Sequence, residues 1–310
     1  MNYLLLFLGF LILILGGNWL LKAAVAISLR LGIPKIVIGM TVVSLATSAP
    51  ELIVSLNSAL NGHADIALGN IIGSNIANLG LVLGIVTLIS TITVQKNFYI
   101  IDWPIMMFSS IMLYLFLAYD GILERYEGVI LFSLLIIFII YLFRSHKTAV
   151  VDEMPEDDVE LPIYTTLFFF IIGSIGLWGG SELLIKGAVN LARDYDVSER
   201  IIGITIISIG TSIPELAASI VAVIKKEKAI SIGNLLGSNM FNILAVLGLT
   251  SMITTLHVED QGLLTFDILW MLYFAIVVLP LVFTPSKMKL GWKEGLILLG
   301  SYLIFITLLL

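Results

Sequence analysis

The sequence predicts an all-α integral membrane protein whose ten transmembrane helices form two inverted-topology repeats of five helices each. Two observations carry this prediction: an apolar composition and a duplicated pair of motifs. The 310 residues are 59% hydrophobic and only 12% charged, with a mean hydropathy of +1.08. This is far too much apolar side chain for one water-soluble core. A span needs roughly 20 apolar residues, so about ten spans would occupy most of the chain.

The succession of apolar and polar stretches places the individual spans. We expect them at 3–30, 34–61, 65–89, 98–119, 127–144, 162–192, 198–224, 229–253, 265–284 and 294–310. The interval 145–161 is polar and acidic and contains Pro155, which is typical of a solvated linker, with an ion-sensing role as the alternative. We therefore divide the chain into a first five-helix half at 1–144, an acidic linker at 145–161 and a second five-helix half at 162–310.

The composition excludes several classes of function. The chain has no cysteine and only three scattered histidines, so thiolate chemistry and a three-histidine zinc site are ruled out. The formal charge of −6, without a clustered basic face, argues against nucleic acid as a partner. Membrane lipid is the expected surrounding, and no obligate protein partner is implied.

The distribution of Lys and Arg predicts the orientation. If the N-terminus lies outside, only three basic residues fall in outer loops: Arg125, Arg193 and Arg200. Eleven then fall in cytoplasmic loops: Arg30, Lys35, Lys96, Arg144, Lys147, Lys225, Lys226, Lys228, Lys287, Lys289 and Lys293. The positive-inside rule therefore predicts both termini outside and the linker in the cytoplasm. The remaining two, Lys22 and Lys186, lie within long helices and should snorkel toward a membrane surface.

An internal repeat is the most informative feature of the sequence. The segment IGMTVVSLATSAPE at 38–51 returns as IGITIISIGTSIPE at 202–215, which is 164 positions later. At the same offset, IALGNIIGSNIAN at 66–78 returns as ISIGNLLGSNMFN at 230–242. A weaker echo relates Glu127-Gly128 to Glu294-Gly295. Because each half holds an odd number of spans, the second copy must enter the membrane from the opposite face, as in secondary transporters.

The repeat carries a carboxylate in the middle of an apolar span, at Glu51 and again at Glu215. An ionisable group at this depth costs at least about 2.5 kcal/mol and indicates function. No Lys or Arg lies at comparable depth in either helix, so these carboxylates favour cations. The spacing of three and four residues stacks hydroxyls on the same helix face. The two faces comprise Ser44, Thr47, Ser48 and Glu51, and Ser208, Thr211, Ser212 and Glu215.

Two prolines should break these helices. Pro50 and Pro214 each remove a backbone donor and crowd the carbonyl four residues earlier, which frees that carbonyl as a further oxygen ligand. Glycines in the following helices allow close approach, which should bring in four more polar side chains: Ser74, Asn78, Ser238 and Asn242. We expect broken helices in spans 2, 3, 7 and 8. A ligand set of oxygens alone suits Na+, Ca2+ or Mg2+.

Other interpretations of these residues remain. Ser, Thr and Pro also produce ordinary helix kinks and hydroxyl back-bonding without any ion. An intramembrane enzyme could use the two glutamates as acid and base, but the sequence lacks the metalloprotease, serine-hydrolase and phosphate-loop motifs. A passive cation channel is less suited to a cage that surrounds its ion with oxygens. We therefore expect a transporter, not an enzyme.

The segments GTSIPE at 210–215 and GSNMFN at 237–242, with their first-half copies, resemble the alpha-repeats of the calcium/cation antiporter superfamily. The resemblance is to its sodium/calcium exchanger branch, in the prokaryotic form without a large regulatory loop. It implies electrogenic exchange of Na+ for Ca2+ by alternating access, four ion sites between the second, third, seventh and eighth helices, and no cofactor beyond the transported ions. The long first and sixth helices would slide across this core.

The resemblance also assigns roles to single residues. Glu51 and Glu215 would be the central Ca2+ and Na+ ligands, and Asn78 and Asn242 would complete the central site. The flanking Na+ sites would include Ser74 and Ser238. Hydroxyls or carbonyls would come from Thr47, Ser48, Thr211 and Ser212, and main-chain carbonyls from Ser44 and Ser208.

Comparison with the other branches of the superfamily favours Na+ over H+ or K+ as the coupling ion. Proton-coupled relatives resemble a Gly-Asn-x-x-Glu pattern, which is a poorer match, and potassium-coupled relatives carry an acid where this chain has Asn242. Ala46 stands where the second copy has Gly210, and its methyl group could restrict how tightly the first helix breaks. A Ca2+/H+ antiporter or a K+-dependent antiporter is the alternative function. Two carboxylates balance one Ca2+ or two Na+, which permits the two ions to compete.

Overall fold

The computed structural model describes residues 2–145, 161–195, 208–284 and 288–309. Most of the expected linker, and the first part of the expected seventh span, therefore lie outside the described residues. The chain divides into two compact units, each containing segments from both halves of the sequence. Unit 1 comprises Met1–Thr47 and Tyr141–Asn234, and unit 2 comprises Ser48–Ile140 and Leu235–Leu310.

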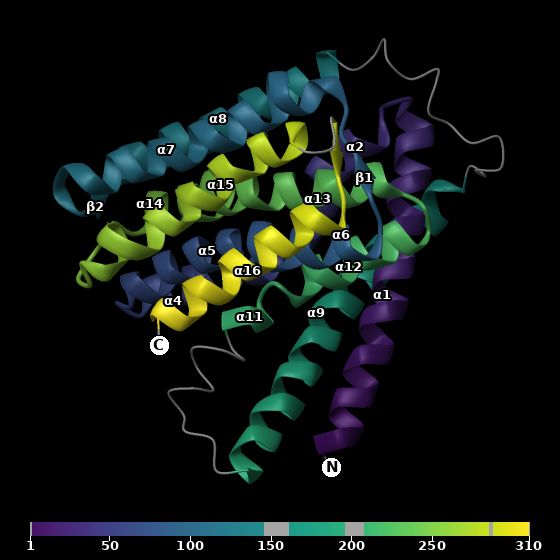
Figure 1. The fold of residues 1–310 in the computed structure, drawn as a ribbon, viewed down its shortest axis with the longest axis horizontal. Coiled ribbons are helices and arrows are strands. Elements are labelled where there is room, and N and C mark those ends of the chain that lie inside the picture. Colours follow the sequence, from purple (N-terminus) through teal and green to yellow (C-terminus); the bar gives the residue numbers. More distant parts are fainter. Residues whose placement is uncertain (1, 146–160, 196–207, 285–287, 310) are drawn as a thin grey trace. The chain divides into compact units, whose positions relative to one another are not determined.

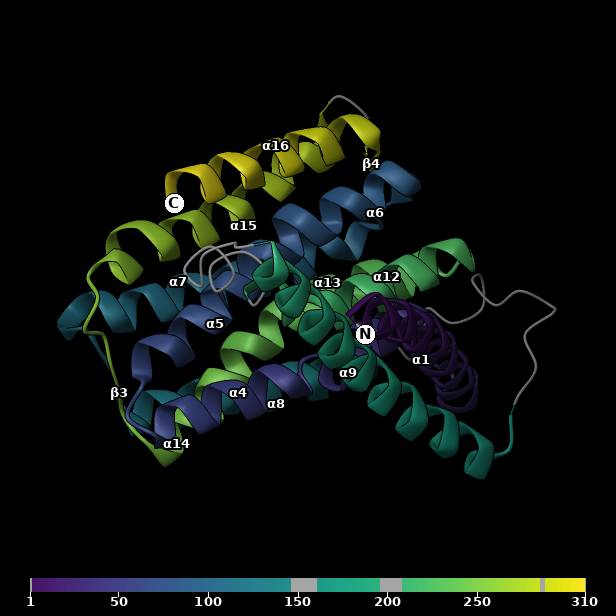
Figure 2. The same cartoon turned by 90° about the horizontal axis from the view of Figure 1, so that it is seen from below.

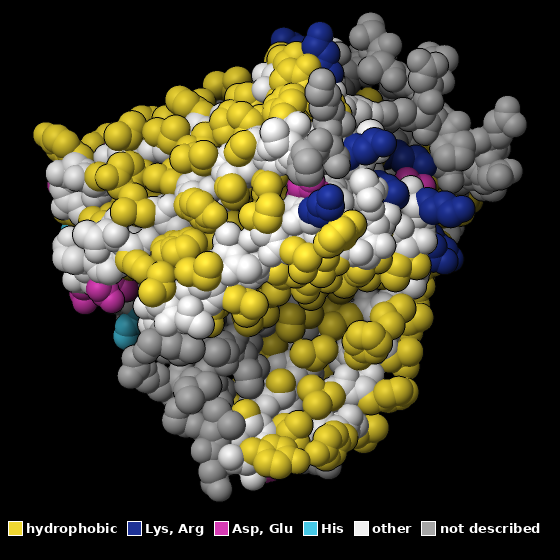
Figure 3. Space-filling view, viewed as in Figure 1, with side chains coloured by type: hydrophobic (Ala, Val, Ile, Leu, Met, Phe, Trp, Pro, Cys, Tyr) yellow, Lys and Arg dark blue, Asp and Glu magenta, His cyan; other side chains and the backbone are white. Residues whose placement is uncertain are grey.

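Unit 1 is built around two long helices, α1 (Asn2–Leu31) and α9 (Ile163–Asp194), which lie side by side (Figures 1 and 2). Glycines permit this close packing: a Cβ added to Gly16 would lie 2.7 Å from the backbone nitrogen of Leu177. The outer faces of both helices expose large apolar side chains, such as Phe7 and Phe168. Figure 3 shows hydrophobic side chains, in yellow, on this part of the surface. Such a surface suits contact with lipid.

The other elements of unit 1 are short, and most of them pack against this pair. They are α2 (Lys35–Ile38), the π-helical turn η1 (Gly39–Val43), α3 (Ser44–Thr47), α11 (Ser208–Gly210), α12 (Ile213–Ile224) and the first part of α13 (Lys228–Phe241). Helix α12 contacts α1, α3 and α9.

Unit 2 holds the remaining helices. Those that carry or support the duplicated motifs are α4 (Ala49–Leu60), α5 (Ala64–Ala77), η2 (Asn78–Val82), α6 (Leu83–Ile89), the end of α13, η6 (Asn242–Leu247) and α14 (Gly248–Ile253). The outer helices are η3 (Phe98–Asp102), α7 (Trp103–Asp120), α8 (Arg125–Ser145, of which 125–140 belong here), η7 (Leu263–Asp267), α15 (Ile268–Phe283) and α16 (Trp292–Leu309).

The two repeats interlock within unit 2. Two short antiparallel ladders join them: β1 (Ile92–Thr93) pairs with β4 (Lys289–Leu290), and β2 (Ile122–Leu123) pairs with β3 (Leu256–His257). Helix α16 of the second repeat packs on α6 of the first (Figures 1 and 2). There a Cβ on Gly295 would lie 2.5 Å from Thr87 Oγ1. A Cβ on Gly128 would likewise be too close to Gly248 and Ser251. Both glycines thus permit close helix packing, which explains why the Glu-Gly pair at 127–128 recurs at 294–295.

The expected spans agree well with the helices. Within the described residues, eight helices are long and apolar enough to cross a membrane, or up to nine if the bent pair at 35–60 counts as one span. Each lies within about three residues of an expected span. Helix α12 is a shorter apolar helix of 12 residues, and the residues that would complete its span lie outside the described part of the chain.

The prolines act as expected. Helices α3 and α4 meet at Ser48 with a bend of 45°, and Pro50 lies in the first turn of α4. The second copy is interrupted at 211–212, and Pro214 lies in the first turn of α12. The prediction of breaks in spans 3 and 8 was wrong: 64–89 and 228–253 are each one continuous helix. They contain no proline, and each instead passes through a π-helical turn, which keeps the backbone hydrogen-bonded.

Close backbone packing in unit 1 makes Gly39 intolerant of a side chain. A Cβ at this position would lie 2.5 Å from the carbonyl oxygen of Ile230 and 3.1 Å from the Cα of Gly233. Because backbone cannot move aside cheaply, we expect Gly39→Ala to destabilise the protein by about 1–3 kcal/mol. The measurement is the thermal unfolding midpoint in detergent. Gly179→Ala is the control, because a Cβ there meets nothing within 4 Å. Equal midpoints for the two variants would contradict this packing.

Candidate ion-binding site

The two glutamates occupy equivalent positions at the start of broken half-helices. Ser48 is the N-cap of α4 and Glu51 lies in its first turn; Ser212 and Glu215 have the same places in α12. Both carboxylate side chains are fully buried. The pattern Ser-x-x-Glu is that of a capping box, yet neither serine makes a capping hydrogen bond. Both glutamates therefore lie next to the positive end of a helix dipole.

In unit 2, buried asparagines cluster beside the helix of Glu51. Helix α4 contacts both α5 and η6. Asn78 and Asn242 are the first residues of the π-helical turns η2 and η6, and π-turns inside helices are frequent at functional sites. Asn242 Nδ2 donates to Asn75 Oδ1 at 3.1 Å, and Asn75 Nδ2 donates to the carbonyl of Asn239 at 3.2 Å. This network joins the two repeats within the unit.

Several oxygens in this cluster lack a hydrogen-bond partner among the described residues. They are Asn78 Oδ1, Asn239 Oδ1 and Asn242 Oδ1, all buried. Leaving a buried polar atom unsatisfied costs about 1–3 kcal/mol. A cation would satisfy such oxygens. Ser74 and Ser238, each one helical turn before Asn78 or Asn242, are also buried.

In unit 1, the predicted hydroxyls meet an asparagine of the second repeat. Ser44 Oγ lies 2.8 Å from the carbonyl oxygen of Gly39 and 3.0 Å from that of Asn234. Thr47 Oγ1 lies 3.1 Å from Asn234 Oδ1. Each hydroxyl donates one hydrogen and keeps lone pairs that could face a cation. The structure therefore places Ser44 and Thr47 together, on a helix that contacts the one bearing Glu215.

The remaining predicted residues of unit 1 differ in environment. Ser212 Oγ is buried and has no hydrogen-bond partner among the described residues, whereas Thr211 is partly exposed. The side chain of Ser208 lies outside the described part of the structure. The carbonyl of Gly210, which Pro214 should free, accepts a hydrogen bond of 3.0 Å from Ser181 Oγ, so it already has one protein partner.

Sequence reasoning missed a second layer of duplicated polar residues. Asn234 Nδ2 donates to Ser219 Oγ at 3.2 Å in unit 1, and Asn70 Nδ2 donates to Ser55 Oγ at 3.1 Å in unit 2. The two pairs are related by the offset of 164, and each serine lies four residues after a motif glutamate. These asparagines lie inside the repeated segments, as do Asn75 and Asn239. Their duplication was the sequence signal that could have identified them as site residues.

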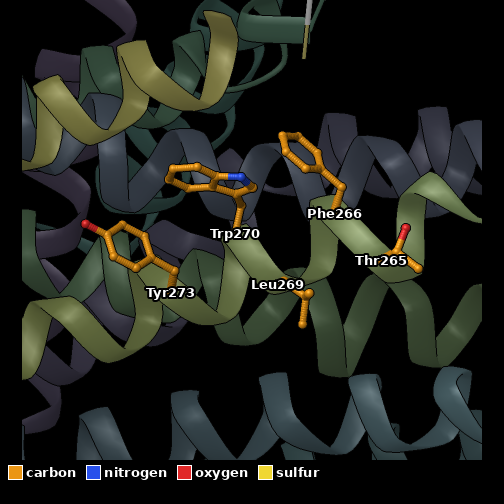
Figure 4. Close-up of a pocket in the computed structure, with 5 residues that line it drawn as sticks. All are labelled: Thr265, Phe266, Leu269, Trp270 and Tyr273. Carbon is orange, nitrogen blue, oxygen red and sulfur yellow. The ribbon is translucent and has the colours of Figure 1, made fainter. Parts of the chain in front are cut away.

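The chemistry of both sets is uniform. Each unit holds one buried carboxylate on a helix that contacts elements bearing buried hydroxyl or amide oxygens. Such oxygens are the ligands that hard cations prefer. By contrast, a hollow of about 260 Å³ on η7 and α15 is lined by Thr265, Phe266, Leu269, Trp270 and Tyr273. Figure 4 shows the rings of Phe266, Trp270 and Tyr273 on one side of the helix. This hollow has no charged lining residue and suits lipid contact rather than ion binding.

Comparison with known proteins agrees with this chemistry. A family model described as sodium/calcium exchanger protein matches residues 1–144 and 165–310. The chain is 35% identical to the putative antiporter CaxA of Alkalimonas amylolytica, over 95% of this chain and 94% of that protein. It is 34% identical to the inner membrane protein YrbG of Escherichia coli, over 98% and 95% respectively.

A solved structure shows the same fold. The sodium-calcium exchanger NCX_Mj, soaked with Na+ and Ca2+, superimposes with a TM-score of 0.83 and 29% identity, covering 99% of this chain and 97% of that one. The fold is thus that of an all-helical, multi-pass membrane protein. The chain belongs to the sodium/calcium exchanger family and is a membrane cation/Ca2+ exchanger rather than an enzyme.

Proposed function

We propose that this protein exchanges Na+ for Ca2+ across the membrane by alternating access, electrogenically and without K+. The observation that carries the proposal is the duplicated Ser-x-Pro-Glu break, which buries one carboxylate in each unit. Each carboxylate lies on a helix that contacts elements bearing hydroxyl or amide side chains. The similarity to NCX_Mj, a sodium-calcium exchanger, supports the same pair of ions.

The charge balance supports competition between the two ions. Glu51 and Glu215 together carry two negative charges, which balance one Ca2+ or two Na+. Ions that compete for the same ligands cannot be carried together, and this mutual exclusion is what antiport requires. A further Na+ would leave a net positive charge, so exchange of three Na+ for one Ca2+ would move charge across the membrane.

We assign the ligands as the sequence suggested. Glu51 and Glu215 are the central ligands, and Asn78 and Asn242 add amide oxygens. The flanking oxygens come from Ser44, Thr47, Ser48, Ser74, Ser208, Thr211, Ser212 and Ser238. Asn75 and Asn234 hold these groups in place through the hydrogen bonds described above.

The orientation is also a proposal. We place both termini outside and the acidic linker, 145–161, in the cytoplasm, because the cationic loops then face inward. The name of YrbG, an inner membrane protein, supports a location in the cell membrane.

Flux in sealed vesicles tests the proposal. The purified protein is reconstituted, loaded with Na+ and diluted into Na+-free medium with radioactive Ca2+ and equal pH on both sides. We expect Ca2+ uptake that disappears when the Na+ gradient is replaced by a choline gradient. Uptake driven by a pH gradient without Na+ would favour Ca2+/H+ exchange instead. A leak that needs no gradient would indicate a channel, and absence of flux would contradict transport.

A further inference from the structure

Unit 1 contains an apolar cavity of about 520 Å³ between α1, α9 and α12. Its walls include Leu13, Ile14, Leu184, Ile213 and Ile220. Phe10, Ile14 and Ile224 line it and are also exposed, so the cavity opens on the apolar outer surface of the unit. Its volume lies within the range of ligand pockets in proteins. This cavity contains none of the proposed ion ligands.

The length of the cavity fits one acyl chain. Its lining follows α12 from Ile213 to Lys225, and 12 helical residues extend for about 18 Å. One leaflet contributes about half of the ~30 Å hydrocarbon core. A single lipid tail from one leaflet therefore matches the cavity in both length and polarity.

A second cavity, of about 620 Å³, adjoins the first and has several charged side chains in its lining. The two share Asn18 and Lys225 as lining residues. The second is lined in addition by Lys22, Phe169 and Glu227. Its wall includes Thr165, near the start of α9, and it lies at the end of α12. Loops adjoin both places, so this cavity lies at the level where a lipid headgroup would lie.

The charges of this second cavity are complementary to a phosphate. Glu227 Oε1 is 2.8 Å from Lys35 Nζ, so its charge is balanced by that lysine. Lys22 and Lys225 then give the cavity a net positive charge. Lys22 Nζ lies 5.4 Å from the centre of the Phe169 ring, a cation–π contact that orients the ammonium.

We propose that unit 1 binds one anionic phospholipid, with an acyl chain in the apolar cavity and the headgroup phosphate between Lys22 and Lys225. In the orientation proposed above, this lipid belongs to the cytoplasmic leaflet, where clustered lysines recognise anionic headgroups. The lipid would lie between the helix of Glu215 and the pair α1 and α9, and so link membrane composition to the packing of these helices.

Native mass spectrometry of the full-length protein in detergent tests the binding. The probes are dioleoyl phosphatidylglycerol, dioleoyl phosphatidylcholine and inorganic phosphate. We expect one phosphatidylglycerol to bind more tightly than phosphatidylcholine, and Lys22→Gln or Lys225→Gln each to weaken it about fivefold. Lys186→Gln is the matched control, an exposed lysine of α9 that lines neither cavity. Equal affinity for the two lipids would overturn the proposal, and so would equal losses in all three variants.

A second set of variants tests the tail. Ile220→Trp, or the milder Ala217→Leu if the first fails to fold, fills the apolar cavity. We expect these variants to lose binding of dioleoyl phosphatidylglycerol. They should still bind dihexanoyl phosphatidylglycerol, because its short acyl chains need less of the cavity. Unchanged dioleoyl binding would contradict the assignment of the cavity. Inorganic phosphate bound as tightly as the lipid would show that the site recognises free phosphate.

Discussion

Replacement of either glutamate by glutamine is expected to abolish Na+-driven Ca2+ uptake while the protein still inserts and folds. Glutamine keeps the shape of the side chain at 51 or 215 and removes one of the two charges that we propose bind a divalent cation. Removing one partner of a buried charge pair costs about 2–5 kcal/mol, which is roughly 30-fold or more in affinity. The measurement is Ca2+ uptake into vesicles at a Ca2+ concentration that saturates the wild-type protein. Gel filtration in detergent checks that the variants fold.

Two other buried glutamates provide a matched control for this experiment. Glu127 and Glu294 lie in the first turns of α8 and α16. Each accepts a backbone hydrogen bond, of 2.9 Å from Glu124 N and 2.8 Å from Gly291 N respectively. Glutamine retains an acceptor oxygen, so Glu127→Gln and Glu294→Gln should keep transport close to wild type. Near wild-type uptake in Glu51→Gln or Glu215→Gln would remove that residue from the site.

The sequence could predict those features that are set by one residue and its neighbours. Pro50 and Pro214 break their helices wherever they lie, because proline removes a donor and crowds the preceding turn. The span limits follow from the apolar lengths. The π-helical turns at Asn78 and Asn242 could not be predicted in this way, because no breaking residue marks them and the polar network around them is tertiary.

The contacts between the two repeats also could not be predicted from the sequence. Asn242 donates to Asn75, which is 167 residues away, and Thr47 meets Asn234. Periodicity shows which face of a helix is polar but not which other helix that face meets. The duplication of Asn70 and Asn75 in the second copy was visible, yet only the packing reveals that Asn75 contacts the predicted ligand Asn242 and that Asn70 contacts Ser55.

Exchange is expected to proceed in K+-free medium, because amides and not carboxylates occupy positions 78 and 242. Both residues are fully buried. The nitrogen of Asn242 donates to Asn75 Oδ1. Its oxygen has no partner among the described residues, and we propose it as a neutral ligand. A third carboxylate would make the set more negative and favour an additional monovalent cation.

Asn242→Asp should therefore change the cation coupling or slow turnover by holding ions too tightly. The new carboxylate also loses the hydrogen that Asn242 donates to Asn75, so two oxygens would face each other unless a cation lies between them. Na+-driven Ca2+ uptake is measured with and without K+, together with Ca2+ and K+ binding curves. Asn61→Asp, an exposed asparagine after α4, adds the same charge elsewhere and should change neither. A strict K+ requirement in the wild type would overturn the first expectation. If the binding curves of Asn242→Asp coincide with those of the wild type, this amide does not bind an ion and only forms hydrogen bonds between helices.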